Sequence, residues 1–499
     1  MLLLILFGLS LGLITWLKLV WSNRYARRIP TIRSAWPVVG HCLKFVRKST
    51  REAFWAVVES FAQVDRLGKL MLGPVPIVFV NHPDLLKELF GRDDLHDKPF
   101  FYDFMGLGGG LITERAGLKW RHSRKMLNPT FNTRMLTGFV PIMDARARKL
   151  TSRLAPFADG RFQIDIMKYI GECTLEIVYN TTMGRNASEL PGQKEYVHNL
   201  EVVMTCLGER MLNVNQHLGF IYRFSKEYKI DQHSRLLCND FTDKIIRERK
   251  RELKSEENDT TIDKEETLRK SLNFLDQILT IKNENGKGFP DEEIPDHLYT
   301  IMSSAHDTSA LTTAYTCLFL AMYPEVQNKV LEEMNEVFYN PSVEVNQDTL
   351  KQLEYTEMVI KEVLRLCPAV PMGARQTSTT IQLDDIEIPP GQILAYCLFT
   401  LHRRPDFWGP DPERFDPERF SPQAVADRHP HAYLPFAAGL RNCIGSRYAW
   451  NSMRIMLLRI VQNYELQTDL KQSDLRFKFE ITLKLDGPHL VRLVRRDST

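Results

Sequence analysis

Apolar residues recur at three- and four-residue spacing over much of the stretch from 51 to 250, for example at Phe54, Val57 and Phe61. This spacing is typical of helices that bury one face. A further helix is predicted from about residue 294 to about residue 322, because Pro295 suits a first helical turn and Pro324 stops a helix.

Strand-like runs are fewer, and the clearest are residues 77–80, 381–388 and 393–398. The Pro-Pro-Gly sequence at 389–391 is predicted to turn the last two runs back on each other. Residues 247–269 mix both charge signs with little apolar content, which is typical of a solvated loop or of exposed helix ends. The pattern therefore predicts a mainly α-helical protein with a minor β-sheet portion.

The N-terminal segment is strongly apolar. Residues 2–17 hold eleven Leu, Ile or Phe residues, worth about −3 to −7 kcal/mol for membrane insertion. The arginines that follow the apolar run (Arg24, Arg27, Arg28 and Arg33) favour a cytosolic body and argue against a cleaved signal peptide. Residues 1–21 are thus predicted to be a transmembrane anchor and 22–40 a basic, proline-containing neck. The alternative, a buried core helix, would need apolar partners on every face.

Composition narrows the function classes. With 43% hydrophobic and 25% charged residues in 499, the chain can bury a large core. No linker divides it after residue 50, so 41–499 is predicted to be one catalytic body. The net charge of +3 lacks the basic footprint of a nucleic-acid binder. The eight cysteines form no C-x-x-C pair, which indicates reduced thiols rather than a disulfide framework.

One cysteine stands in a specific pattern. Residues 434–449 read LPFAAGLRNCIGSRYA and fit F-x-x-G-x-R-x-C-x-G, with the fixed positions Phe436, Gly439, Arg441, Cys443 and Gly445. Glycines beside a cysteine allow turns that bring backbone N–H groups toward its sulfur. A helix predicted from about Ile444 would present its positive N-terminus to the same sulfur. Cys443 is therefore predicted to be an anionic ligand.

A lone thiolate suits haem better than zinc, because a structural zinc site takes four ligands. Haem takes one axial protein ligand, and a thiolate there favours O–O bond cleavage. Arg441 would then meet a haem propionate. The alternative is a buried cysteine in a glycine-rich turn.

With this loop the chain resembles the microsomal cytochromes P-450, and among them it is similar to the insect and vertebrate fatty-acid-hydroxylase branch. The resemblance implies the cytochrome P-450 fold, with haem b between a long central helix and the cysteine loop. It also implies dioxygen and a lipophilic substrate, NADPH-cytochrome P-450 reductase as partner, and an endoplasmic reticulum membrane location with contact to membrane lipid.

Three further sets of residues support the resemblance. In KEVLRLCP, Glu362 and Arg365 lie three apart on a helix and can pair. Arg419 resembles the third member of the family's Glu-Arg-Arg network, which implies a role in holding the shape of the haem pocket. Alone, such a pair is usually a solvated surface pair.

In KWRHSRK, Trp120 and Arg124 stand one turn apart and can both reach toward one anionic group. The resemblance makes that group a haem propionate. Arg375 and His402 occupy positions where relatives often place contacts near the haem edge. The alternative is that Trp120 is core and Arg124 is surface.

Within the long predicted helix, Thr308 can donate a hydrogen bond to the carbonyl of residue 304 and loosen the helix locally. Asp307 could resupply protons through water, and the resemblance makes this pair the oxygen-activating residues. Two departures from the family pattern stand here. Ala305 replaces a glycine, and Ser304 replaces a glutamate that esterifies haem in many fatty-acid hydroxylases. Because a hydroxyl is not expected to form that ester, haem b is expected to be held non-covalently, and the fatty-acid assignment loses one of its supports.

The stretch FFYDFMGLGGG at 100–110 does not fit a nucleotide loop. In relatives it lies over the substrate, so its aromatic residues are expected to form either an apolar wall or ordinary core. The predicted function is a haem-thiolate monooxygenase that inserts one atom of dioxygen into a lipophilic substrate, an endogenous lipid or a xenobiotic, with electrons from NADPH. A haem-thiolate isomerase or dehydratase and a non-enzymatic haem carrier are the alternatives.

Overall fold

A computed structural model of the chain describes residues 2–184, 191–258, 273–340 and 343–496. Side chains are not described at residues 2–9, 11 and 256–258. The charge-mixed segment predicted at 247–269 continues α9 as far as 258, and its remainder lies outside the described residues.

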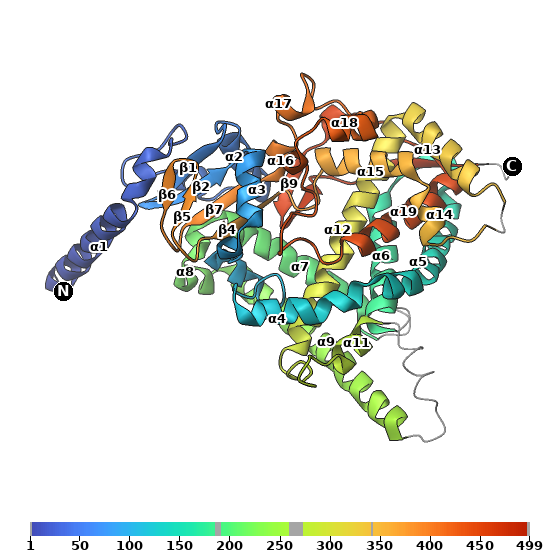
Figure 1. Ribbon diagram of the computed structural model, residues 1–499, viewed down its shortest axis with the longest axis horizontal. Coiled ribbons are helices and arrows are strands. Elements are labelled where there is room, and N and C mark those ends of the chain that lie inside the picture. Colours follow the sequence, from blue (N-terminus) through green and yellow to red (C-terminus); the bar gives the residue numbers. More distant parts are fainter. Residues whose placement is uncertain (1, 185–190, 259–272, 341–342, 497–499) are drawn as a thin grey trace.

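Helices make up most of the described chain (Figure 1). They are α1 (Leu2–Ser22), α2 (Thr50–Phe61), α3 (Pro83–Gly91), α4 (Leu118–Leu127), α5 (Thr133–Leu154), α6 (Ile166–Met183), α7 (Gln193–Leu212), α8 (Gly219–Arg223), α9 (Lys226–Asn258), α11 (Phe274–Thr280), α12 (Ile294–Met322), α13 (Pro324–Val337), α14 (Gln347–Lys351), α15 (Glu354–Leu366), α16 (Leu398–Leu401), α17 (Pro405–Trp408), α18 (Pro422–Ala426) and α19 (Ser446–Asn463). The strands are β1 (Leu67–Leu72), β2 (Val75–Val80), β3 (Asp159–Asp165), β4 (Met372–Gln376), β5 (Ile381–Leu383), β6 (Ile386–Ile388), β7 (Ile393–Cys397), β8 (Tyr464–Gln467), β9 (Phe477–Glu480), β10 (Thr482–Leu485) and β11 (Leu490–Arg495). The predicted fold class, mainly α with minor sheets, is confirmed.

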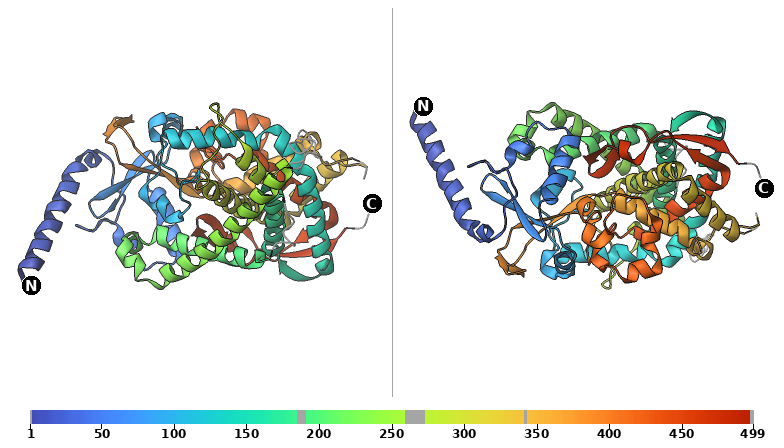
Figure 2. Two further views of the ribbon diagram at one scale, coloured as in Figure 1. Left: turned by 90° about the horizontal axis from the view of Figure 1, so that it is seen from below. Right: turned by 90° about the horizontal axis from the view of Figure 1, so that it is seen from above.

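Helix α12 is the central element. Its bounds match the prediction, and Pro295 lies in its first turn. It runs through the middle of the molecule in Figures 1 and 2, packed against α6, α15 and α19. Neighbouring elements bury most of its residues, including polar ones such as Thr312 and Thr316, whose hydroxyls donate to carbonyls one turn earlier in the helix.

The largest sheet has the strand order β1-β2-β7-β4, with β2 and β7 parallel and the other pairs antiparallel. This arrangement corrects the prediction of a hairpin closed by Pro-Pro-Gly. Residues 381–388 form their own hairpin, β5 with β6, which turns at Asp384 (φ 48°). The chain at Gly391 instead packs beside Thr377, whose carbonyl accepts the Gly391 N–H, and β7 pairs with β2 and β4. Pairing with strands distant in the sequence therefore decides the position of β7, and the local turn signal does not.

Helix α1 extends away from the body of the molecule (Figures 1 and 2). Among the residues whose side chains are described, no helix meets the length and apolarity needed to cross a membrane. Most of the apolar run at 2–17 falls outside those residues, so the anchor stays a prediction.

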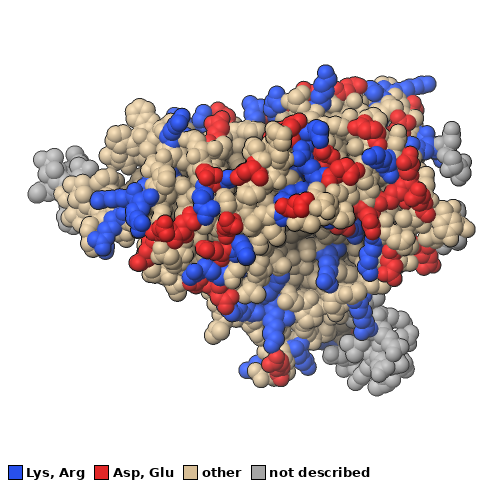
Figure 3. All heavy atoms as spheres, turned by 45° about the horizontal axis from the view of Figure 1, so that its top comes forward, with Lys and Arg blue, Asp and Glu red and all other residues tan. Residues whose placement is uncertain are grey.

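Charge is spread evenly over one large face of the molecule. On the face shown in Figure 3, Lys and Arg side chains are interspersed with Asp and Glu, in keeping with the net charge of +3. Such mixing gives that face little long-range field of a single sign.

Candidate active site

A pocket of about 550 Å³ lies between α12 and the loop that precedes α19. Its lining brings together most of the predicted site residues, which come from four separate segments of the chain. They are Trp120, Arg124, Asp307, Thr308, Arg375, Phe436, Arg441, Cys443 and Gly445. Gly439 and the Glu362, Arg365 and Arg419 network lie outside this lining. We call the space the cysteine cavity.

The cysteine loop is held by its own backbone. The Cys443 N–H donates to the Phe436 carbonyl at 3.0 Å. Gly439 has a φ of 71°, and a Cβ there would collide with the carbonyl oxygen of Phe90, so glycine is required. Gly445 is the N-cap residue of α19, which begins at Ser446, two residues later than predicted. The positive end of α19 thus lies beside Cys443, as the sequence indicated.

Cys443 differs from the other seven cysteines, of which Cys42 is half-buried and the rest are buried. Its side chain is exposed to the cavity that it lines. Enclosure by protein raises the pKa of the Cys443 thiol, while the Gly445 N–H and the charge of Arg124 act in the opposite direction. The Gly445 N–H and Arg124 thus favour the thiolate form, as a metal ion at the sulfur would.

Three cations face the cavity from different segments. Burial lowers the pKa of Arg441 to about 10, and the nearby charge of Arg375 adds to the effect. Burial, followed by the charges of Arg375 and Arg441, holds the pKa of Lys98 well below its usual range. The Nε and Nη1 atoms of Arg441 are buried and have no hydrogen-bond partner among the described residues. An anionic group in the cavity would relieve this repulsion and satisfy these donors, which is what carboxylates on a haem would do.

Trp120 and Arg124 both line the cysteine cavity, and each has its own partner within the protein. The Trp120 Nε1–H donates to the Leu111 carbonyl at 3.2 Å, and the indole ring instead carries the Arg441 guanidinium 4.5 Å from its centroid. Arg124 donates to the carbonyl and the side-chain oxygen of Asn442, at 2.9 and 2.7 Å. Arg124 thus fixes the residue next to Cys443, and Trp120 supports Arg441.

Helix α12 presents hydroxyl groups to the cavity. As predicted, Thr308 Oγ1 donates to the Ser304 carbonyl, at 2.8 Å. The predicted loosening is not seen, because α12 stays α-helical throughout and Thr312 makes the same bond to Thr308. The Ser304 hydroxyl donates to the Thr300 carbonyl at 2.6 Å. Ala305 lines the cavity beside them.

Asp307 has two partners that the sequence did not reveal, both on β10. It accepts a hydrogen bond from Thr482 Oγ1 at 2.5 Å, and Lys484 Nζ lies 3.7 Å from its other oxygen. Burial alone would lower the pKa of Lys484, but the charges of Asp307 and Glu480 outweigh it and raise that pKa. The alternation of TLKL does place Thr482 and Lys484 on one face of a strand. Nothing in the spacing relates that face to residue 307.

The predicted Glu362–Arg365 pair is fully buried. Arg365 donates to both carboxylate oxygens, at 2.6 and 2.8 Å, and also to the carbonyls of His402, Pro412 and Arg414. Arg419 Nε lies 3.7 Å from the same carboxylate, so the three predicted members do assemble.

Two further residues lie near this network, and the sequence did not place either of them there. Arg428, which the sequence did not indicate, stacks 4.0 Å over the Trp408 ring and donates to the Arg419 carbonyl. His402 lies with this network rather than at the cavity. Its Nε2 accepts the Leu434 N–H at 3.0 Å, and burial lowers its pKa to about 3.

The aromatic stretch at 100–110 divides between wall and core. Phe100, Phe101 and Tyr102 line the cysteine cavity, whereas Phe104 packs under the Arg210 guanidinium at 3.9 Å. The glycines that follow serve packing, because the Gly109 N–H donates to Asp296 on α12 at 2.7 Å. Apolar side chains from α2, α7 and the largest sheet complete the walls.

Comparison with known proteins agrees with the resemblance drawn from the sequence, and it covers nearly the whole chain after the N-terminal segment. The family model described as cytochrome P450 matches residues 30–490. Cytochrome P450 4V2 of Mus musculus is 32% identical over 478 residues, which cover 94% of this chain and 90% of that protein. The Homo sapiens protein of the same name is 32% identical over 479 residues (95% and 90%). Cytochrome P450 4c21 of Blattella germanica is 31% identical over 463 residues (92% and 91%). Relatives thus come from vertebrates and insects, as the resemblance predicted.

Proposed function

The chain belongs to the cytochrome P450 family, and on that premise we propose that it oxygenates an endogenous lipid or a xenobiotic with electrons from NADPH-cytochrome P-450 reductase. Membership makes it a haem-thiolate monooxygenase that uses dioxygen, a lipophilic substrate and a redox partner. The observation that carries the proposal is the cysteine cavity. It joins a thiol, unpartnered cationic donors and a wall of apolar side chains within one enclosure.

The residues present fit haem b, held without a covalent ester. Cys443 is the proposed axial ligand of the iron, and Arg441, Arg375 and Lys98 are the proposed partners of the propionates. When bound, haem supplies the iron that activates dioxygen. The Ser304 hydroxyl is engaged by the helix, which favours non-covalent retention. Phe436, Gly439 and Gly445 are proposed to shape the loop, with Trp120 and Arg124 bracing it.

Asp307 and Thr308 are the proposed catalytic residues for proton supply. The Thr308 hydroxyl lines the cavity, and its hydrogen is directed to the Ser304 carbonyl. Its oxygen can therefore accept a hydrogen bond from water in the cavity. Asp307 lies on the side of β10, where Thr482 and Lys484 hold its carboxylate. When its ion pair with Lys484 opens, the Asp307 carboxylate can take up a proton from solvent water and then donate it toward the cavity.

The walls favour a lipophilic substrate. Side chains such as Phe100, Phe101 and Val203 contribute apolar surface and no charge, so binding rests on burial of apolar area. The resemblance to fatty-acid hydroxylases points to a lipid chain. Ala305 and Ser304 distinguish this site from that branch.

We place the protein at the endoplasmic reticulum membrane, with residues 1–21 as the anchor, 22–40 as the neck and 41–499 as a cytosolic body. The apolar N-terminal run and the arginines after it support this placement. The reductase is proposed to dock near α4 and the cysteine loop. There, Arg447 is exposed, Lys125 pairs with Glu284 at 2.6 Å, and Arg121 lies 3.4 Å from Asp93.

The test uses purified, haem-loaded protein with the reductase and NADPH. We expect substrate-dependent NADPH consumption and a product that contains one atom of oxygen from labelled dioxygen. The Cys443→Ser variant should lose the red-shifted ferrous–CO band, because a neutral hydroxyl cannot supply the electron density of a thiolate. Substrate turnover without NADPH and reductase would instead support an isomerase or dehydratase.

A further inference from the structure

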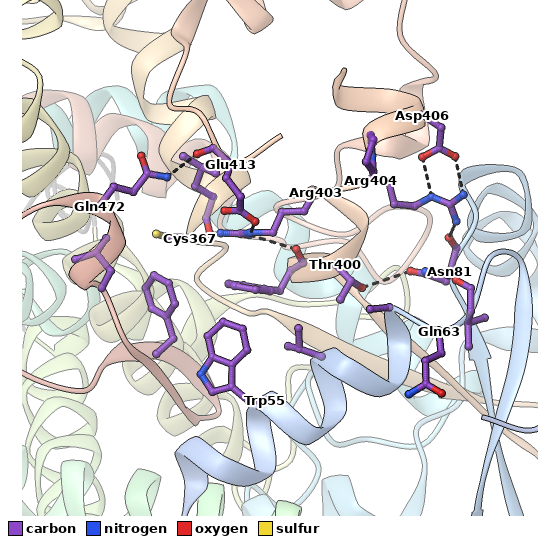
Figure 4. Close-up of a pocket in the computed structure, with 18 of the residues that line it drawn as sticks. Trp55, Gln63, Asn81, Cys367, Thr400, Arg403, Arg404, Asp406, Glu413 and Gln472 are labelled. Atoms are coloured by element: carbon purple, nitrogen blue, oxygen red, sulfur yellow. Dashed lines mark hydrogen bonds and ion pairs between the residues drawn. The ribbon is translucent and has the colours of Figure 1, made fainter. Parts of the chain in front are cut away.

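A second pocket, of about 650 Å³, lies outside the cysteine cavity. Helix α2, α16, α17 and the segment around β9 form its walls (Figure 4). In Figure 4, Trp55 projects from α2 on one side of the pocket, and Arg403 and Glu413 lie on the opposite side. Its size suits a small organic molecule. We call it the Trp55 pocket.

Helix α2 divides the two spaces. Trp55 and Val58 lie on one face of α2 and line the Trp55 pocket together with Ala62, the residue that caps the C-terminus of α2. Val57 and Phe61 lie on another face and line the cysteine cavity. The Trp55 pocket is therefore a separate compartment and not a branch of the proposed active site.

The floor of the Trp55 pocket is aromatic. Trp55 and Phe399 meet edge to face with centroids 5.7 Å apart, and Phe477 lies 5.9 Å from Phe399. The Arg403 guanidinium is stacked on the Phe399 ring at 3.7 Å. The buried Phe399 ring is thus covered by Arg403, and the half-buried Trp55 is the ring that can meet an entering cation.

The mouth of the pocket presents carboxylates. The side chains of Asp65, Glu413 and Asp406 are 80%, 62% and 45% exposed. The arginines that pair with them, Arg403 and Arg404, are each only 13% exposed. Three carboxylates face two guanidiniums, and an entering molecule meets the carboxylates first. The charge and the aromatic floor both favour a cation.

We propose that the Trp55 pocket is a second small-molecule site, which binds a planar aromatic compound that carries a fixed positive charge. The ring lies against Trp55, and the charge lies toward Glu413 and Asp65. This binding site is independent of the oxygenation chemistry proposed for the cysteine cavity.

The test compares two ions of one shape on the haem-loaded full chain in lipid nanodiscs. The probes are trimethyl(1-naphthylmethyl)ammonium and 1-naphthylmethanesulfonate. A quaternary ammonium has no lone pair and cannot ligate haem iron. Calorimetry should show the ammonium ion binding about ten-fold more tightly than the sulfonate. Equal affinities would contradict the proposal.

Matched variants locate the bound ion. Ala62→Trp fills the mouth of the pocket and should weaken ammonium binding at least about ten-fold. Ala155→Trp is the control, because Ala155 is also an exposed alanine at a helix C-terminus and lines neither space. Glu413→Gln should weaken ammonium binding and strengthen sulfonate binding, since it leaves Arg403 without its carboxylate. Equal losses in both tryptophan variants would overturn the assignment.

A second titration is made with clotrimazole filling the cysteine cavity through its azole. Ammonium binding should persist with the same stoichiometry, because α2 separates the two spaces. Complete loss of binding would place the ion in the cysteine cavity and refute a second site.

Discussion

The buried Glu362–Arg365 pair allows a quantitative test of how the cysteine cavity keeps its shape. In Glu362→Gln, the Arg365 guanidinium loses a bidentate carboxylate at 2.6 and 2.8 Å but stays fully buried. Stranding a buried charge in this way costs about 3–5 kcal/mol. The Arg419 guanidinium, 3.7 Å from the same carboxylate, loses attraction as well.

The Arg365→Met variant loses stability for a different reason. Glu362 keeps the Asp416 N–H at 2.9 Å and the nearby Arg419, but three carbonyls lose their donor. Each unpaired buried carbonyl costs about 1–3 kcal/mol. We therefore expect Arg365→Met to destabilise the protein more than Glu362→Gln does.

The double variant, Glu362→Gln with Arg365→Met, separates the energy of the ion pair from the effect of changed packing. Each single variant includes the penalty of one stranded charge, and that penalty is absent when both residues are neutral. The two single losses should therefore sum to about 2–3 kcal/mol more than the loss of the double variant.

Calorimetry of the haem-loaded protein measures these differences. The unfolding entropy of a chain of this length is about 1 kcal/mol/K. Glu362→Gln should then lower Tm by about 3–5 °C. The ferrous–CO spectrum checks that each variant still holds haem. If the two single losses simply added up to the double loss, the pair would not act as a coupled ionic unit, and the reasoning would fail.

Three further outcomes are expected. Thr308→Ala should leave haem bound but uncouple NADPH oxidation from product formation, and Thr308→Ser should restore coupling; unchanged coupling in the alanine variant would remove Thr308 from the mechanism. Burial lowers the pKa of His402 to about 3, so the unfolded state takes up a proton that the folded state does not between about pH 3 and the ordinary pKa of about 6.5. This proton removes about 1.4 kcal/mol of stability per pH unit as pH falls through that window. The His402→Gln variant keeps an acceptor for the Leu434 N–H. In denaturant titrations between about pH 3 and about pH 6.5, its free energy of unfolding should fall less steeply with decreasing pH than that of the unchanged protein. The same slope in both proteins would contradict the argument. Lys125→Glu with Arg447→Glu should slow turnover driven by the reductase more than turnover driven by peroxide, with the difference shrinking at high salt; an equal fall in both activities would indicate damage to the site instead of to docking.

The sequence by itself determined the elements whose signals are local. The bounds of α12 follow from Pro295, Pro324 and an apolar run, because prolines start and stop helices without reference to the rest of the fold. The cysteine loop could likewise be predicted from the sequence. A fixed spacing of glycines, an arginine and Cys443 sets the backbone that surrounds the sulfur, and the structure places Arg441, Cys443 and Gly445 together with Thr308 in one cavity.

Only the tertiary structure decided which distant groups meet. Pro-Pro-Gly signals a turn but not a partner, so β7 pairs with β2 and β4 across the sheet instead of with 381–388. Lys98 and Lys484 belong to no motif, and each reaches its site because a different part of the chain folds against α12 or the cysteine loop. Spacing along a chain reports contacts within one element, whereas charge clusters and cavities form where several elements converge.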